Sequence, residues 1–165
     1  MSRNLAGIEL EATVERPKQF VVFTLSDRRY GLPLSAVDRV ARMVDVTPVP
    51  KAPDIVLGIV NVQGRVIPVI DVRRRFRLPQ RDIVLADQLV IAHTGRRTVA
   101  LAADAVSGVL EYSGLKTVGA RDIVPGIEYV EGAVKLEDGL VLIHDLNKFL
   151  SLEEETVLDR AMENV

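Results

Sequence analysis

The side chains best suited to acid–base chemistry are two aspartates and two histidines. Asp71 and Asp145 could form a carboxylate pair, but each precedes a short helical turn, where an aspartate accepts hydrogen bonds from backbone N–H groups. His93 and His144 have no Asp or Glu at a spacing typical of metal ligands. The chain has no cysteine, which excludes thiol catalysis and disulfides. We therefore expect two helix caps, structural or solvated histidines, no metal or cofactor, and no enzymatic activity.

A basic cluster follows the first of these aspartates. It consists of Arg73, Arg74, Arg75, Arg77 and, nearby, Arg81. Nucleic-acid surfaces are usually strongly basic or carry exposed aromatic residues. This chain has a net charge of −2 and 4% aromatic residues, so a solvated helix face or contact with an acidic protein is favoured. The alternative is a small β-barrel protein that binds nucleic acid through Arg73–Arg81.

The elements that carry these residues form an internal repeat. A shift of 69 positions aligns two hairpin-like segments, and a shift of 74 positions aligns two later segments. The first shift matches Val21 with Val90, Arg28 with Arg97, Leu32 with Leu101, Val37 with Val106 and Val40 with Val109. The second matches Gly58 with Gly132, Val60 with Val134, Val69 with Ile143, Asp71 with Asp145 and Val72 with Leu146. The preserved order indicates a duplication of roughly 70-residue halves.

Each half is expected to contain about five short strands, and a small sheet with open edges is prone to aggregation. Closure of each half into a small barrel avoids such edges, and two adjacent barrels would leave a groove between them. After the second half, Ser151 and Glu154 have the spacing of a capping box. A C-terminal helix is therefore expected from about residue 152, with an apolar face made of Leu152, Val157, Leu158 and Met162.

The most specific segment of the chain is 58–76. Its pattern predicts a strand, a tight turn, a second strand and a short helix. Gln63 and Gly64 lie at the expected hairpin tip, where glycine accommodates positive φ. The segment contains no nucleophile–base pair, no metal-ligand cluster and no phosphate loop. It therefore favours a binding scaffold over an enzyme.

Together with residues 20–34 and 99–110, this segment resembles the chemotaxis coupling protein family, CheW, and the resemblance covers roughly residues 18–150. It implies an all-β fold of two five-stranded SH3-like β-barrels related by a pseudo-twofold axis, with short helices and a C-terminal helix. The expected organisation is an N-terminal tail at 1–17, a CheW-like domain at 18–152 with barrels at about 18–84 and 85–150, and the C-terminal helix at 153–165.

The resemblance also implies a function. Proteins of this family are non-catalytic adaptors that couple the cytoplasmic tip of methyl-accepting chemoreceptors to the regulatory domain of a CheA-type histidine kinase. We therefore expect a cytoplasmic scaffold of two-component signal transduction with these two partners, no nucleic acid, and contact with a membrane only through the receptor. The sequence agrees with the expectation that membrane contact is indirect, because no apolar run reaches the ~18 residues needed to span a bilayer.

The resemblance places candidate partner contacts in three groups. They are Val37, Arg39 and Val40 on a barrel surface; Gly58, Asn61, Gln63 and Gly64 on a strand and hairpin facing the groove; and Ala100 and Val109 in the second barrel. Proteins of the family commonly have Asn-Leu-Arg-Gly at the hairpin, where this chain has Asn-Val-Gln-Gly. Glutamine lacks the charge and the donor fork of arginine. Either Arg65 supplies the cation instead, or the partner lacks the matching acid.

Some of these residues could serve the fold of the chain itself instead of a partner. Val37 and Val40 could face the core of their own barrel, or they could form the apolar centre of an interface with Arg39 at its rim. Gly58 and Gly132 could allow the close approach of a partner helix, or they could form bulges that curve a barrel. The sequence leaves both choices open.

Overall fold

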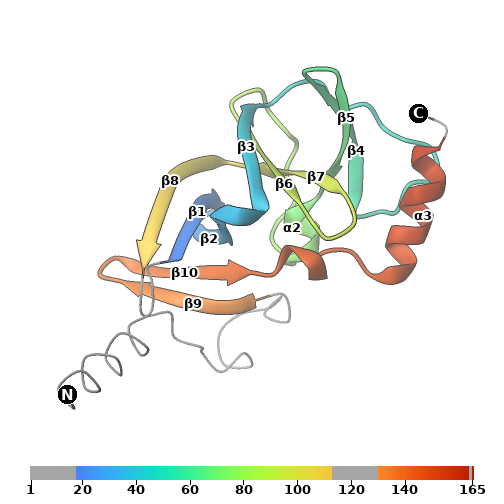
Figure 1. Ribbon diagram of the computed structural model, residues 1–165. Coiled ribbons are helices and arrows are strands. Elements are labelled where there is room, and N and C mark those ends of the chain that lie inside the picture. The colour runs from blue at the N-terminus through green and yellow to red at the C-terminus, as the bar shows by residue number, and fades with distance from the viewer. Residues whose placement is uncertain (1–17, 113–129, 164) are drawn as a thin grey trace, which may run out of the picture.

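Ten β-strands and four short helical segments make up the part of the chain that the computed structural model describes, residues 18–112, 130–163 and 165 (Figure 1). The expected tail at 1–17 lies outside it. The strands are β1 (Lys18–Leu25), β2 (Arg28–Pro33), β3 (Val37–Arg42), β4 (Val56–Val62), β5 (Arg65–Ile70), β6 (Gln88–His93), β7 (Thr98–Ala103), β8 (Ala105–Tyr112), β9 (Val130–Leu136) and β10 (Gly139–His144). The helical segments are η1 (Leu34–Ala36), α2 (Val72–Arg75), η4 (Leu146–Lys148) and α3 (Leu152–Met162).

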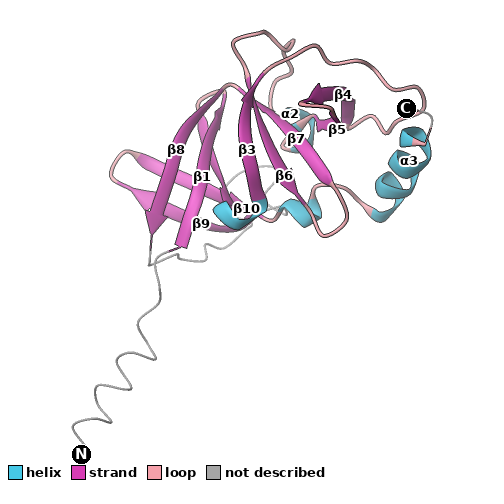
Figure 2. Ribbon diagram, turned by 45° about the horizontal axis from the view of Figure 1, so that its top comes forward, coloured by secondary structure: helices cyan, strands magenta, loops and turns pink. Residues whose placement is uncertain are grey.

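The strands form two five-stranded sheets, as expected for the two SH3-like barrels. Sheet 1 has the order β8-β1-β2-β10-β9, and sheet 2 has the order β3-β6-β7-β5-β4. All neighbouring strands are antiparallel except β10 with β2 and β5 with β7. Figure 2 shows the sheets side by side, with α3 beside sheet 2.

The repeat seen in the sequence recurs in the strand positions and in the pairing register. Strands β9 and β10 begin and end 74 positions after β4 and β5, respectively. The parallel pair of Val69 with Ala100 in sheet 2 corresponds to the pair of Ile143 with Gly31 in sheet 1. A bulge also falls at equivalent places, with Asp38 of β3 and Ser107 of β8 left out of the ladder. The two sheets are therefore two copies of one plan.

The expected sequential division into barrels at about 18–84 and 85–150 must be corrected. Sheet 1 combines β1 and β2 from the first half with β8, β9 and β10 from the second, while sheet 2 combines β3, β4 and β5 with β6 and β7. The halves exchange strands because β3 pairs with β6, and β8 pairs with β1. Hydrophobic patterning predicts each strand but does not specify which distant strand it joins.

The inner strands β1, β6 and β7 are buried along most of their length, and the buried side chains form three apolar clusters. One fills sheet 1 and is formed by Phe20, Val22, Val134, Val141 and Ile143. A second fills sheet 2 and includes Val60, Ile67, Val69, Leu89, Ile91 and Ala100. The largest contains side chains of both sheets, including Phe23, Tyr30, Leu32, Val90, Val99, Leu101 and Leu142. Successive residues of β6 from Leu89 to Ala92 alternate between the core of sheet 2 and this shared core, and β1 contributes side chains both to the core of sheet 1 and to the shared core.

The helix α3 begins as the sequence predicts but presents a different face. Ser151 and Glu154 form the expected capping box. Leu158 is fully buried, whereas Leu152 is 72% exposed, so the prediction that Leu152 belongs to the apolar face was wrong. Arg75 binds both carboxylate oxygens of Glu154, at 2.7 and 2.8 Å. Burial raises the pKa of Glu154, but the Ser151 N–H and Arg75 outweigh this effect and hold the pKa below its usual value.

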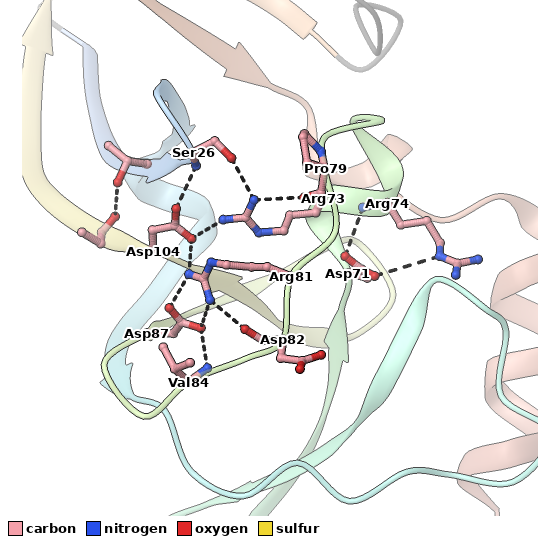
Figure 3. A network of polar contacts seen from close by, with 12 residues as sticks. Ser26, Asp71, Arg73, Arg74, Pro79, Arg81, Asp82, Val84, Asp87 and Asp104 are labelled. Carbon is pink, nitrogen blue, oxygen red and sulfur yellow. Dashed lines mark hydrogen bonds and ion pairs between the residues drawn. The ribbon is translucent and has the colours of Figure 1, made fainter.

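A polar network joins the two sheets where the chain passes from β7 to β8 (Figure 3). Asp104 occupies this crossover and accepts a hydrogen bond from the backbone N–H of Ser26, which lies in the turn after β1, at 2.8 Å. The same carboxylate pairs with Arg73 of α2 and with Arg81, at 2.5 Å for the latter. Arg81 also binds the buried Asp87 at 2.6 Å. The network therefore ties the sheet 1 turn to the loop and helix beside sheet 2.

Burial alone raises the pKa values of Asp104 and Asp87 because it disfavours their charged forms. Hydrogen bonds outweigh this effect of burial, so both pKa values lie below the usual range. Asp104 accepts them from Arg73, Ser26 and Arg81, and Asp87 accepts them from Arg81 and Val84. A carboxyl group whose pKa is lower in the folded state stabilises the fold above its unfolded pKa. That contribution is lost as the pH falls through the folded pKa.

We predict that Asp104→Asn lowers the free energy of unfolding at pH 7 by about 2 kcal/mol, because two guanidinium groups lose their charged acceptor. We also expect the wild-type protein to lose more stability than this variant between about pH 5 and pH 2. Urea unfolding at a series of pH values measures both effects. Asp138→Asn is the matched control, because Asp138 pairs with Arg29 but its side chain is 76% exposed. It should change stability by less than about 0.5 kcal/mol, and equal losses in the two variants would contradict the prediction.

Candidate functional site

The two aspartates act as helix caps, as expected from the sequence. Asp71 Oδ1 accepts a hydrogen bond from the Arg74 N–H at 3.0 Å at the start of α2. Asp145 Oδ1 accepts one from the Asn147 N–H at 3.0 Å at the start of η4. Each carboxylate is therefore used by its own helical turn, and the two belong to different halves of the repeat.

The two histidines occupy different environments. His93 is exposed, and its Nδ1 lies 2.8 Å from Asp38 Oδ1 in a hydrogen bond. His144 is buried and stacks on Phe76, with 4.2 Å between the ring centroids. Among the described residues, no three His, Cys, Asp or Glu side chains gather in a way that could hold a metal ion.

Internal ion pairs engage much of the basic cluster. Arg73 and Arg81 belong to the network around Asp104, and Arg75 binds Glu154. Arg73 also donates to Ser26 Oγ at 2.9 Å and to the Pro79 carbonyl at 3.2 Å. These arginines connect α2 and the following loop to the rest of the fold. Their charge is largely compensated within the chain, which disfavours the nucleic-acid alternative.

A cavity of about 490 Å³ lies beside this network. Its polar lining consists of aspartates, arginines and Gln80, and its apolar lining includes Val46 and Leu57. No Ser, Thr, Cys, His, Lys or Tyr is among the residues that line it. The cavity therefore offers no hydroxyl, thiol or amine nucleophile. Among its carboxylates, Asp71 caps α2, and Asp87 and Asp104 are held in ion pairs. This favours a binding site on the surface of the molecule.

Strand β3 brings the first group of candidate contacts to the edge of sheet 2. Val37 is half-buried and packs against the shared core. Arg39 is exposed, and Val40 is 38% exposed. Because Asp38 is bulged out of the ladder, Val37 and Val40 are three residues apart yet lie on the same side of the strand. Val37 thus serves mainly the fold, while Arg39 and Val40 are available to a partner.

The hairpin between β4 and β5 lies next to this edge. Gln63 and Gly64 form its tip with φ values of +52° and +84°, and Asn61 Oδ1 accepts a hydrogen bond from the Gly64 N–H at 2.9 Å. Arg39 Nη1 donates to Gln63 Oε1. Arg65 instead donates to Thr98 Oγ1 at 3.0 Å. The cation that contacts the tip residue therefore comes from β3 and not from Arg65.

Gly58 has a structural role that the sequence left open. It is buried, with a φ of +154°, and it follows the bulged position of β4. A Cβ atom at this position would lie 2.4 Å from the carbonyl oxygen of Thr47. Thr47 pairs with Ile59 through two backbone hydrogen bonds of 2.8 and 2.9 Å. The close approach that needs this glycine is made by the chain's own backbone, so direct contact between Gly58 and a partner helix is not supported.

The two candidate residues of the second half also differ from each other. Ala100 is fully buried inside sheet 2, opposite Val69, so its expected role as a direct partner contact must be corrected. Its small side chain fits the interior of a sheet that curls around its own core. Val109 is 57% exposed on β8, one of the two edge strands of sheet 1. It is the repeat equivalent of Val40.

Sequence reasoning missed two contacts that shape these surfaces. Arg39 and Gln63 are 24 positions apart, and the pairing that brings β3 to the hairpin involves strands of both halves. The network around Asp104 was missed for the same reason. The one sequence signal for it is a charged residue between two apolar strands, which by itself is equally typical of an exposed turn.

Comparison with known proteins supports this description. The CheW-like domain family matches residues 19–154. The chain is 27% identical to the chemotaxis protein CheW of Klebsiella aerogenes over 86% of this chain and 87% of that protein. It is 28% identical to the chemotaxis protein CheW of Treponema pallidum over 82% of this chain and 84% of that protein.

A solved structure extends the likeness to three dimensions. The scaffolding protein TtCheW from Thermoanaerobacter tengcongensis superimposes with a TM-score of 0.74 and 28% sequence identity, covering 84% of this chain and 90% of that one. Among the described residues, no helix is both long and apolar enough to cross a bilayer. The family match, the relatives and the shared fold show that the chain belongs to the CheW family, and it is a non-catalytic scaffold of chemotaxis.

Proposed function

We propose that this chain acts in the cytoplasm as an adaptor that couples methyl-accepting chemoreceptors to a CheA-type histidine kinase, and that it meets the membrane only through the receptor. The observation that carries the proposal is a pair of equivalent edge strands. β3 forms one edge of sheet 2 and β8 forms one edge of sheet 1. Each exposes a valine at the same position of the repeat, Val40 at 38% and Val109 at 57%.

Two such edges suit an adaptor because they belong to different sheets of one rigid unit. The shared core packs side chains of both sheets against each other, and the Asp104 network holds the crossover between them. A scaffold that binds two proteins at fixed positions raises the effective concentration of one near the other. It therefore needs no chemistry of its own to promote their interaction.

A few side chains at the desolvated centre of an interface supply most of the binding free energy in protein complexes, and this centre is more apolar than the polar rim around it. Val40 has Arg39 and Arg42 as exposed neighbours on β3, and Val109 lies beside the exposed Gly108 on β8. Each edge therefore combines an exposed apolar side chain with a backbone whose geometry is fixed by the sheet. Residues Asn61, Gln63, Gly64 and Arg65 extend the β3 surface along the hairpin.

The adaptor proposal is tested with three purified proteins: this chain, the regulatory domain of a CheA-type kinase, and a receptor cytoplasmic fragment. We expect each binary complex to form with a Kd below about 50 µM, and all three proteins to elute together in size-exclusion chromatography. Binding of one partner that excludes the other would show that the chain is not a bridge. The absence of both binary complexes at about 50 µM would overturn the proposal.

We predict that Val40→Asp and Val109→Asp weaken different partners, each by about tenfold or more, because a carboxylate forced into an apolar contact loses its water without gaining a partner. Isothermal titration calorimetry with each partner measures the losses, and thermal unfolding verifies that both variants remain folded. Val84→Asp is the matched control, since Val84 is 49% exposed in the loop before β6, and it should bind both partners normally. Unchanged affinity in both edge variants would remove these strands from the interface.

A further inference from the structure

Charge at the β3 edge indicates which kind of surface binds there. The β3 corner, defined here as residues 37–42 with hairpin residues 61–66, contains three arginines and one acidic residue. The acidic residue, Asp38, is hydrogen-bonded to His93. Arg39 and Arg42, which precede and follow Val40 along β3, are exposed. Around Val40, the corner is therefore cationic.

The contact between Arg39 and Gln63 orients one of these cations without neutralising it. Gln63 Oε1 accepts a hydrogen bond from Arg39 Nη1, and an amide oxygen carries no net charge. Within the described residues, no carboxylate forms an ion pair with Arg39. A guanidinium group has five N–H donors in a planar fork, so the group held by Gln63 keeps donors for a second acceptor.

Such an arrangement is suited to a carboxylate on a partner. A guanidinium binds a carboxylate through two parallel hydrogen bonds, and a side chain already held in place loses less conformational entropy on binding. We propose that the β3 corner recognises an acidic protein surface that covers both faces of this edge strand, with a carboxylate that binds Arg39 on one face and an apolar side chain that contacts Val40 on the other. This inference rests on the proposed adaptor function and specifies the chemistry of the partner that binds at β3.

The test begins with the partner whose binding Val40→Asp weakens, either the kinase regulatory domain or the receptor fragment. Against that partner, Arg39→Glu should weaken binding by about tenfold or more because it places like charges together. Gln63→Glu is isosteric and should weaken binding by about threefold to tenfold, since the new carboxylate would pair with Arg39 and neutralise it. Arg77→Glu is the matched control, as Arg77 is exposed in the loop after α2, and it should bind like the wild type.

Salt dependence provides a second measurement. Wild-type affinity should fall between about 0.05 M and 0.5 M salt, and Arg39→Gln should fall less steeply because one charge pair is missing. Normal binding by Arg39→Glu, with Val40→Asp still defective, would overturn the acidic-surface inference and leave the adaptor proposal intact. Tighter binding by Gln63→Glu would also overturn it, because the partner would then be basic. If Val40→Asp weakens neither partner, β3 is not a docking edge, and this inference fails together with the placement of that surface.

Discussion

The exchange of strands between the two halves is the constraint on which the rest of the structure depends. The third strand of each half leaves its own hairpin and pairs with the first strand of the other half, β3 with β6 and β8 with β1. The last strand of each half then pairs in parallel with the second strand of the other half, β5 with β7 and β10 with β2. Neither half holds all the strands of a sheet, so both sheets must form together. Contacts between residues so far apart in the sequence form slowly during folding. Once formed, they make the two sheets one cooperative unit.

Exchange also explains why the strands are so uniformly aliphatic. Strands β1 and β6 face a sheet's own core on one side and the shared core on the other, and two-sided burial favours continuous runs of Val, Ile and Leu. It limits the size of some residues as well. A Cβ atom on Gly31 would lie 2.8 Å from Cδ1 of Ile143, and its repeat equivalent is the small, fully buried Ala100. The small size of the residues at these two positions is therefore determined by packing against the neighbouring parallel strand.

The sequence predicts what local chemistry determines. Asp71 and Asp145 as caps, the Gln63–Gly64 hairpin tip and the capping box at Ser151 each depend on residues a few positions apart. The duplication could also be recognised, because equivalent strands keep their residue types. The partner of each strand could not be predicted, since alternation fits any neighbour of suitable register. For the same reason the burial of Ala100 could not be predicted and the role of Gly58 stayed open, because accessibility depends on which strand or segment lies opposite each residue.

The sheet edges show how a β-scaffold can bind proteins without aggregating. An exposed edge strand with regular geometry invites a further strand to pair with it. Here β3 is interrupted by the bulge at Asp38 and carries arginines, β8 has the equivalent bulge at Ser107 followed by Gly108 at a φ of +131°, and β4 is covered in part by the bridge from Thr47 to Ile59. Each device weakens pairing of the edge backbone with a further strand, while Val40 and Val109 stay exposed on β3 and β8. Recognition at these edges must then depend on side chains, which is why an exposed valine and an oriented arginine can determine what binds.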